Sequence, residues 1–171
     1  MEGALARDGA VQVSALRAAL GAGLLVLACG LVHHDVTVEA PFTVGGGPPT
    51  ATTTIEAAAL TAPLQASAGD LSKLSSVTMQ SVHLVSDDSG DLSYLATTTL
   101  TLTAAGLPDV PLATLKAAPT AGQSDVALVV DGRDLKPYLA NGGSITAALT
   151  YSARPVAARG LKLVLVIRGT L

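Results

Sequence analysis

Alternation of apolar and polar residues is the dominant pattern of the chain after residue 35. Its first clear example puts an apolar residue at every second position of residues 36–44, namely Val36, Val38, Ala40, Phe42 and Val44. Successive side chains of a strand point to opposite faces, so this period predicts a β-strand with one buried face. Pro41 cannot donate to a ladder, which predicts that this strand lies at a sheet edge or is broken there.

Six further segments have strand periodicity or β-branched composition and are separated by turn residues. They cover residues 77–86, 95–104, 110–117, 124–132, 144–153 and 161–169. The last segment is apolar on both faces at its centre, which predicts a strand inside the sheet. About seven short strands predict a mainly β fold, an antiparallel β-sandwich with Ig-like strand spacing. That likeness is architectural and implies no function.

The connecting segments carry their own signals. Residues 45–54 are rich in Gly and Pro and are expected to form a loop. Residues 56–60 fit either the end of a strand or the start of a helix, and Pro63 limits both. Asp70 is expected to cap a short turn. Residues 134–142 predict one helical turn, with Asp134 at its N-cap, Pro137 in the first turn and Gly142 as its stop.

The N-terminal region has a different pattern, because residues 18–32 contain no charge over 15 positions. A membrane-spanning helix needs roughly 20 apolar residues, so this run is short for a span. It fits the apolar core of a secretory signal, about 7–15 residues long, with Arg17 as its positive flank. We therefore expect an N-terminal hydrophobic signal helix that ends at Ala28.

The residues Val26, Leu27, Ala28 and Cys29 resemble the lipobox of bacterial lipoproteins. The resemblance implies that residues 1–28 are a signal peptide and that Cys29 carries acyl chains such as palmitate. Residues 29–35 would then be a lipidated tether and 36–171 the β-sandwich domain. Two or more acyl chains anchor a protein stably. A plain signal peptide, an uncleaved anchor helix and a buried free thiol remain alternatives.

The resemblance also implies an address, the bacterial cell envelope. In this family an Asp directly after the lipidated Cys resembles an inner-membrane retention signal. Gly30 stands at that position. The outer membrane is therefore slightly favoured.

Composition excludes one class of partner. Aromatic residues make up 2% of the chain and its net charge is −3. Nucleic-acid binding needs aromatic stacking platforms or a basic surface, and neither is present. Cys29 is the only cysteine, so no disulfide can form within the chain.

Two groups of side chains were weighed as metal sites. His33, His34 and Asp35 lack a fourth ligand at recognisable spacing, which favours a polar tether. Asp87, Asp88 and Asp91 surround Gly90 and are candidate Ca²⁺ ligands, but the EF-hand spacing is absent and a solvated turn is favoured. No cofactor is expected.

His83 is the candidate catalytic base, since it lies in a predicted strand away from the tether. A hydrolase would need an Asp and a Ser beside it, and the chain has no G-x-S-x-G motif. A structural strand histidine is favoured, and we do not expect an enzyme.

Three functions follow in order. The first is a membrane-anchored envelope lipoprotein that acts as a non-catalytic structural or protein-interaction module. The alternative is an envelope carrier that binds a lipid or other apolar ligand between its sheets. The third is a hydrolase that uses His83. A filled core favours the first, an apolar cavity the second, and a contact of His83 with a carboxylate in a cleft the third.

Overall fold

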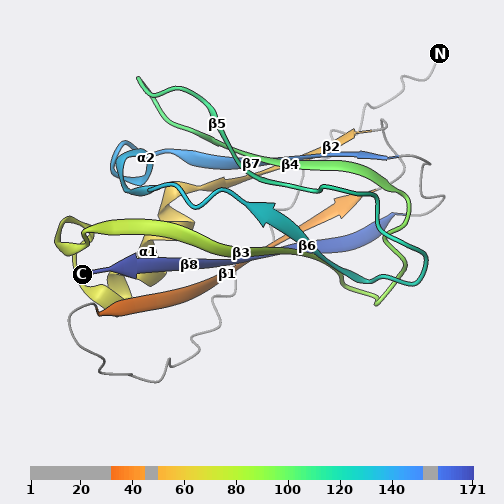
Figure 1. Ribbon diagram of the computed structural model, residues 1–171, viewed down its shortest axis with the longest axis horizontal. Helices are drawn as coiled ribbons and strands as arrows, with labels where there is room; N and C mark the ends of the chain where they lie inside the picture. Colours follow the sequence, from red (N-terminus) through yellow and green to blue (C-terminus); the bar gives the residue numbers. More distant parts are fainter. Residues whose placement is uncertain (1–31, 45–49, 152–157) are drawn as a thin grey trace, which may run out of the picture.

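The computed structural model describes residues 32–44, 50–151 and 158–171, and within these it is mainly antiparallel β-structure (Figure 1). Eight strands form one sheet in the order β1-β8-β3-β6-β5-β4-β7-β2. The strands are β1 (His33–Val44), β2 (Thr50–Glu56), β3 (Ser76–Ser86), β4 (Leu95–Thr103), β5 (Val110–Thr114), β6 (Asp125–Val130), β7 (Ser144–Tyr151) and β8 (Arg159–Thr170). The expected signal helix and lipidated Cys29 lie outside the described residues.

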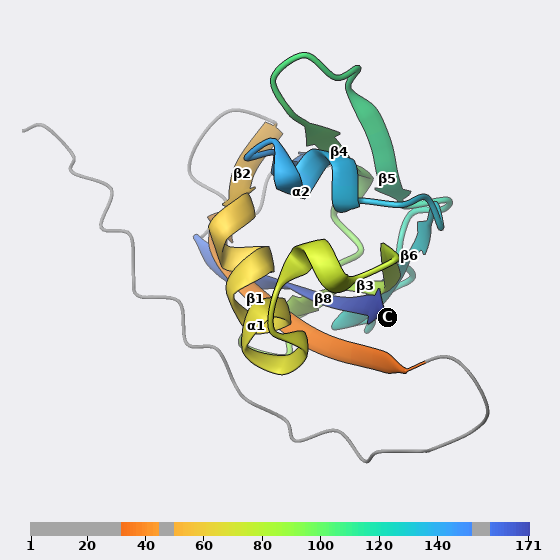
Figure 2. The same ribbon diagram turned by 90° about the vertical axis from the view of Figure 1, so that its left-hand side faces the viewer.

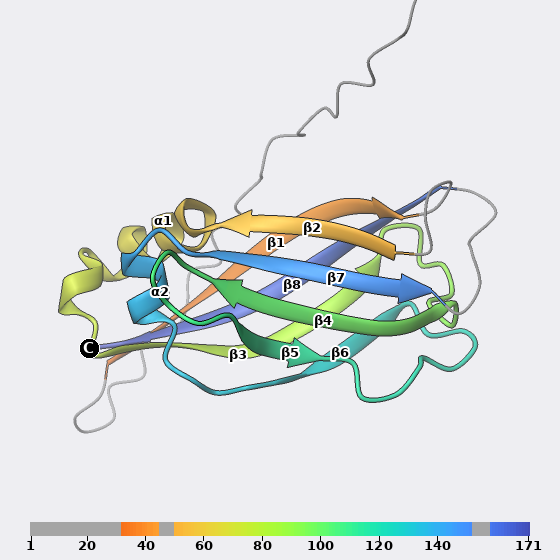
Figure 3. The ribbon, with the colours of Figure 1, turned by 90° about the horizontal axis from the view of Figure 1, so that it is seen from above.

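The sheet folds over on itself into two four-stranded halves (Figure 3). One half is β1-β8-β3-β6 and the other is β5-β4-β7-β2. They are joined along one side by only two residue pairs of β5 and β6, Ala113↔Val130 and Thr114↔Val129. We call this junction the seam. The prediction of an antiparallel β fold is confirmed, but the two layers are halves of one nearly closed, eight-stranded sheet.

The core lies between the two halves and is built almost entirely of aliphatic side chains. On β8, the four alternating residues Leu161, Leu163, Leu165 and Ile167 are all 0% exposed. This strand pairs with β1 on one side and β3 on the other, as expected for a strand apolar on both faces at its centre. Leu100, Leu102 and Leu149 cover it from the opposite half, also at 0% exposure. A continuous leucine-rich cluster therefore replaces the aromatic residues that the chain lacks.

Strand β1 lies at one end of the strand order, so the prediction of an edge strand from Pro41 is confirmed. The strand begins earlier than expected, because His33 already pairs with Thr170 and Asp35 with Arg168. Residues 33–35 were assigned to the tether, and here they form the first part of the strand. The reason is non-local, since β8 is long enough to offer them partners.

The expected loop over residues 45–54 was wrong at its C-terminal end. Thr50 to Thr54 belong to β2, which pairs with β7 from Thr50↔Thr150 to Glu56↔Ser144. Threonine is β-branched and suits a strand once a partner strand is present, which outweighs the preceding Gly-Pro signal. The ambiguous residues 57–60 start helix α1 (Ala57–Ala68), which contains Pro63.

The helices close one end of the barrel (Figure 2). These are α1, the 3₁₀ turn η1 (Leu71–Lys73) and α2 (Lys136–Ala140), and α1 inserts Leu60 and Leu64 at 0% exposure. We call this the helical end. The β3–β4 and β5–β6 connections lie at the opposite end, which we call the loop end (Figure 1).

Two predicted caps are confirmed at the helical end. The Asp70 carboxylate accepts a hydrogen bond from the Ser72 N–H at 2.9 Å and starts η1. The Asp134 carboxylate accepts from the N–H of Lys136 at 3.0 Å and from that of Val77 at 2.9 Å. It therefore starts α2 and ties that helix to β3, while Gly142 follows the helix with a φ of +67°.

Candidate functional site

The described chain begins at the helical end of the barrel. The N–H of Leu171 donates to the carbonyl of Val32 at 3.0 Å, so both ends of the described chain meet there. Val32 is three residues after Cys29 in the sequence. Any group carried by Cys29 is thus tethered to the helical end. Within residues 32–44, 50–151 and 158–171, no helix is long and apolar enough to cross a membrane.

The residues His33, His34 and Asp35 each have a separate partner. The His33 Nδ1 lies 3.2 Å from the Thr170 hydroxyl, and the His34 Nδ1 lies 3.0 Å from the Ser67 hydroxyl on α1. Asp35 binds Arg168. Neighbouring side chains of the strand face opposite ways, so the three do not converge on one point. No group of three metal-ligating side chains occurs among the described residues.

The carboxylates of Asp88 and Asp91 at the loop end are engaged within their own loop. The Asp88 carboxylate accepts hydrogen bonds from the Ser86 hydroxyl and, at 2.8 Å, from the Gly90 N–H. The Asp91 carboxylate accepts from the Ser93 N–H at 2.7 Å. The Ser86 hydroxyl lowers the pKa of Asp88, and the Ser93 N–H lowers that of Asp91. These bonds stabilise a turn, and Asp87, Asp88 and Asp91 do not form a ligand set.

The loop is crowded where it meets β8. A Cβ built on Gly90 would lie 2.5 Å from an Arg159 guanidinium nitrogen, and one built on Gly160 would lie 2.5 Å from the Asp87 carboxylate. Arginine and aspartates are therefore packed closely at this corner of the loop end. The Arg159 charge also contributes to the lowered pKa of both Asp88 and Asp91.

His83 meets a carboxylate, as a catalytic base would require. Its Nδ1 lies 2.8 Å from the Asp125 carboxylate oxygen, across β3 and β6. Their side chains are 40% and 57% exposed, on the open outer face of the sheet. No serine hydroxyl is hydrogen-bonded to His83 within the described part of the chain. The pair has a base and its orienting acid, but it lies outside a cleft.

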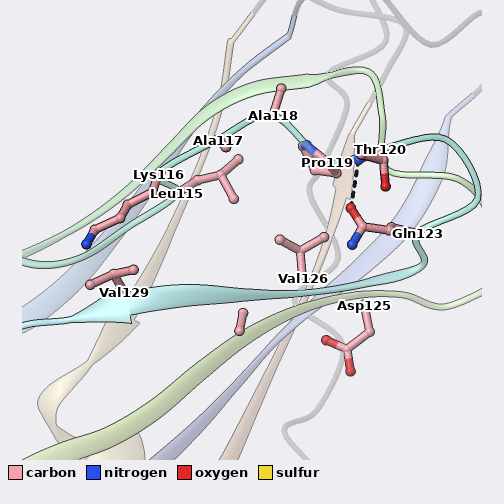
Figure 4. A pocket seen from close by; sticks show the side chains of 11 residues that line it. Leu115, Lys116, Ala117, Ala118, Pro119, Thr120, Gln123, Asp125, Val126 and Val129 are labelled. Carbon is pink, nitrogen blue, oxygen red and sulfur yellow. Dashed lines mark hydrogen bonds between the residues drawn. The ribbon is translucent and has the colours of Figure 1, made fainter.

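A pocket of about 400 Å³ opens at the loop end of the seam (Figure 4). One wall is the segment of residues 115–120, which follows β5, and the other is β6. We call this the seam pocket. Val126 points into it, whereas Asp125 points to the other side of β6 (Figure 4). Alanine, valine, leucine and proline provide most of the lining, with Lys116, Thr120 and Gln123 as its polar members.

Sequence reasoning missed this pocket. The residues 115–120 read as a plain connection between two predicted strands, and none of them carries an obvious chemical signal. The pocket exists because β5 and β6 separate, which depends on pairing between distant segments. A cavity was expected between the sheets for a carrier, and the seam pocket lies instead at the mouth of the junction, beside the filled core.

Comparison with known proteins does not assign the chain to a family, since no family model and no curated protein matches it. The function must therefore be inferred from the chain's own residues and geometry.

Proposed function

We propose that this protein is a lipid-anchored module of the bacterial cell envelope that binds a protein partner and has no catalytic role. One observation carries the proposal, namely that the anchor-side residue Val32 and the seam pocket lie at opposite ends of the barrel. Strand β1 has 12 residues, which at about 3.3 Å each separate the two ends by roughly 40 Å. A membrane-anchored barrel would then present its loop end to partners.

The anchor itself depends on the lipobox-like residues up to Cys29. The tether between Cys29 and β1 is only three residues long, since β1 begins at His33. Acyl chains at Cys29 would hold the helical end close to the membrane surface. Stable attachment requires at least two chains, as a single one binds reversibly.

The absence of a catalytic role is supported by how the candidate groups are used. His83 and Asp125 form a pair on an open sheet face, where substrate would stay fully hydrated. Catalysis by a general base relies on a positioned substrate and benefits from excluded water. The carboxylates of Asp88 and Asp91 accept hydrogen bonds from their own loop.

A carrier of an apolar ligand is the second candidate, and the seam pocket is the observation that favours it. Its volume of about 400 Å³ falls within the usual range of ligand sites, about 300–1,000 Å³. Lys116 on its wall offers a cation to an acidic head group. Solvent extraction of the purified Cys29→Ser chain, followed by mass spectrometry, would reveal a lipid bound at stoichiometric amount if the protein is a carrier.

The anchor is tested by expressing the full chain in a bacterium fed a labelled fatty acid. We expect label on the native chain and none on the Cys29→Ser variant. The intact mass should correspond to loss of residues 1–28 and gain of acyl chains. The serine variant is a matched control, because Cys29 is the only cysteine. Equal labelling of both chains, or none on either, would contradict a lipid anchor at Cys29.

The partner is tested by photo-crosslinking in the intact envelope. A photoreactive residue at Thr120, beside the seam pocket, should crosslink one protein reproducibly. The same residue at Ser72, at the helical end, should not. Crosslinking from Ser72 alone would place the partner at the wrong end of the barrel.

A further inference from the structure

We propose that the backbone edge of β6 at Asp125 and Ala127 binds an extended segment of a partner protein, which adds to the sheet as a strand inside the seam pocket. The inference rests on the proposed partner-binding function and names its mode, which is strand addition. It requires a row of peptide groups that no strand of this chain already uses.

The side of β6 to which each peptide group points follows from one hydrogen bond. The N–H of Ser86 donates to the carbonyl of Ser124 at 2.9 Å, in the same register that pairs Leu84 with Val126 and Val82 with Leu128. In an antiparallel ladder, hydrogen-bonded and non-hydrogen-bonded pairs alternate. The peptide groups of Val126 and Leu128 therefore point to β3, and those of Asp125 and Ala127 point to the other side, toward β5.

On that other side the ladder stops early. The N–H of Asp131 donates to the carbonyl of Leu112 at 2.7 Å, and the last pair is Thr114↔Val129. Continued pairing would bring Lys116 opposite Ala127 and Ala118 opposite Asp125. No backbone hydrogen bond joins these positions in the described chain.

The cause of the separation is the pairing of β5 with its other neighbour. The N–H of Leu115 donates to the carbonyl of Thr98 at 2.9 Å, which continues the β4–β5 register beyond the end of β5. The chain thus follows β4 while β6 follows β3, and the seam opens between them (Figure 4). Farther on, Gln123 closes the loop, since its side-chain oxygen accepts from the Thr120 N–H at 2.7 Å.

The opened seam has the size and lining for one extended segment. A strand added to β6 would lie about 4.8 Å from it, within the space that the seam pocket provides. Its inward side chains would meet Val126 and Pro119, which favours small or aliphatic residues. Val129 is 44% exposed beside this edge, so an added strand would also cover an exposed apolar side chain.

Charge favours a neutral segment. The Asp125 carboxylate is held on the outer face by His83, and Lys116 is the cation on the pocket wall. An occupant with several charges of one sign would leave them unpaired against the aliphatic lining. The segment that fits best therefore alternates Thr or Ser with Val or Ala.

The test measures amide hydrogen exchange by NMR on the full chain carrying Cys29→Ser. Without ligand, the amides of Val126 and Leu128 should be protected, while those of Asp125 and Ala127 exchange freely. The probe is an acetylated and amidated octapeptide that alternates Thr and Val. We expect it to slow exchange at Asp125 and Ala127 by about tenfold or more.

Two variants at one position separate the backbone from the side chain. Ala127→Pro removes the donor that faces the seam, without removing a bond to β3, and should abolish the peptide's effect at Asp125. Ala127→Ser keeps the donor and should retain that effect. Protection of Leu84 on β3 reports whether either variant is folded.

Three results would overturn the inference. The first is strong protection of Asp125 and Ala127 in the free chain at all protein concentrations, which means that the edge is closed. The second is protection that appears without peptide as protein concentration rises, which means that a second copy occupies the edge. The third is no peptide effect at millimolar concentration, or an effect on β1 or β2 instead. Because Cys29 is absent from this experiment, its failure is independent of the lipid-anchor test.

Discussion

Arg168 on β8 binds Asp35 on β1 through two parallel hydrogen bonds. The guanidinium Nε donates to the Asp35 Oδ1 and the Nη2 donates to the Oδ2, each at 2.7 Å. This two-bond geometry is the strongest that an arginine forms with a carboxylate. It fixes the first residues of β1 at the helical end, where the chain joins the barrel. The Arg168 bonds lower the pKa of Asp35, and the same bonds raise that of Arg168.

The first prediction concerns pH. Because the folded-state pKa of Asp35 lies below its unfolded value, its carboxylate stabilises the fold above about pH 4, and this contribution is lost as pH falls through the lowered pKa. Asp35→Asn should lower the free energy of unfolding at pH 7 by about 0.5 kcal/mol, since both side chains are more than a third exposed. Urea denaturation at pH 7 and at about pH 2.5 measures the difference.

Arg168→Gln and the double variant complete a mutant cycle for this pair. The coupling between the two sites should be present at pH 7 and disappear at the lower pH. A cost of Asp35→Asn that is the same at both pH values would show that packing, rather than the charged pair, is lost.

The second prediction concerns a buried hydroxyl. Thr98 on β4 is 1% exposed, and its Oγ1 has no hydrogen-bond partner in the described structure. A buried polar group without a partner is destabilising, and replacing it with an apolar group of the same shape removes that cost. Thr98→Val should raise the free energy of unfolding by about 1 kcal/mol.

Thr99→Val is the matched control, because the neighbouring Thr99 points to the outer face and is half-buried. Its effect should stay within about 0.5 kcal/mol. Destabilisation by Thr98→Val in thermal or urea unfolding would mean that the Thr98 hydroxyl is satisfied, for instance by an ordered water molecule.

Local patterns in the sequence were sufficient for several elements. The alternation of Leu161 to Ile167 defines a strand with one fully buried face, and its apolar second face indicates a central position. Pro41 marks an edge for a reason confined to one residue, its missing N–H. Asp70 and Asp134 predict helix starts because capping involves groups only two residues away.

Other features depend on which segments pair, and no local pattern contains that information. Thr50 to Thr54 became a strand because β7 lies beside them. The contact of His83 with Asp125 requires the β3–β6 register, and the seam pocket requires β5 to leave β6 while it stays with β4. Shifting a register by one residue turns side chains to the opposite face, so these sites could not be placed from the sequence.

The third prediction concerns two glycines with opposite surroundings. A Cβ on Gly143 would lie 2.6 Å from the Thr103 carbonyl oxygen and 2.8 Å from that of Tyr138, whereas one on Gly132 would meet nothing within 4 Å. Gly143→Ala should therefore lower the free energy of unfolding by about 1–3 kcal/mol, as the backbone around it must shift. Gly132→Ala should be neutral or stabilise by about 0.5 kcal/mol, because alanine restricts the unfolded chain.

Thermal unfolding of the two alanine variants decides this prediction. Similar losses in both would mean that the cost comes from the loop backbone in general. A stable Gly143→Ala chain would mean that β4 and α2 pack less closely than the distances from Gly143 indicate.

The last prediction concerns the orientation of the lipidated barrel. If acyl chains at Cys29 hold the helical end at the membrane, a fluorophore on α2's final turn should lie near the lipid surface and one in the β5–β6 loop far from it. Asn141→Cys and Ala121→Cys provide these positions, because both residues are exposed and they lie at opposite ends. With an acceptor dye in the bilayer, energy transfer should be stronger from Asn141→Cys, given an end-to-end separation of about 40 Å. Equal transfer from both sites would mean that the barrel lies along the membrane, which would bring the seam pocket close to the lipid and favour a ligand drawn from the bilayer over a partner protein.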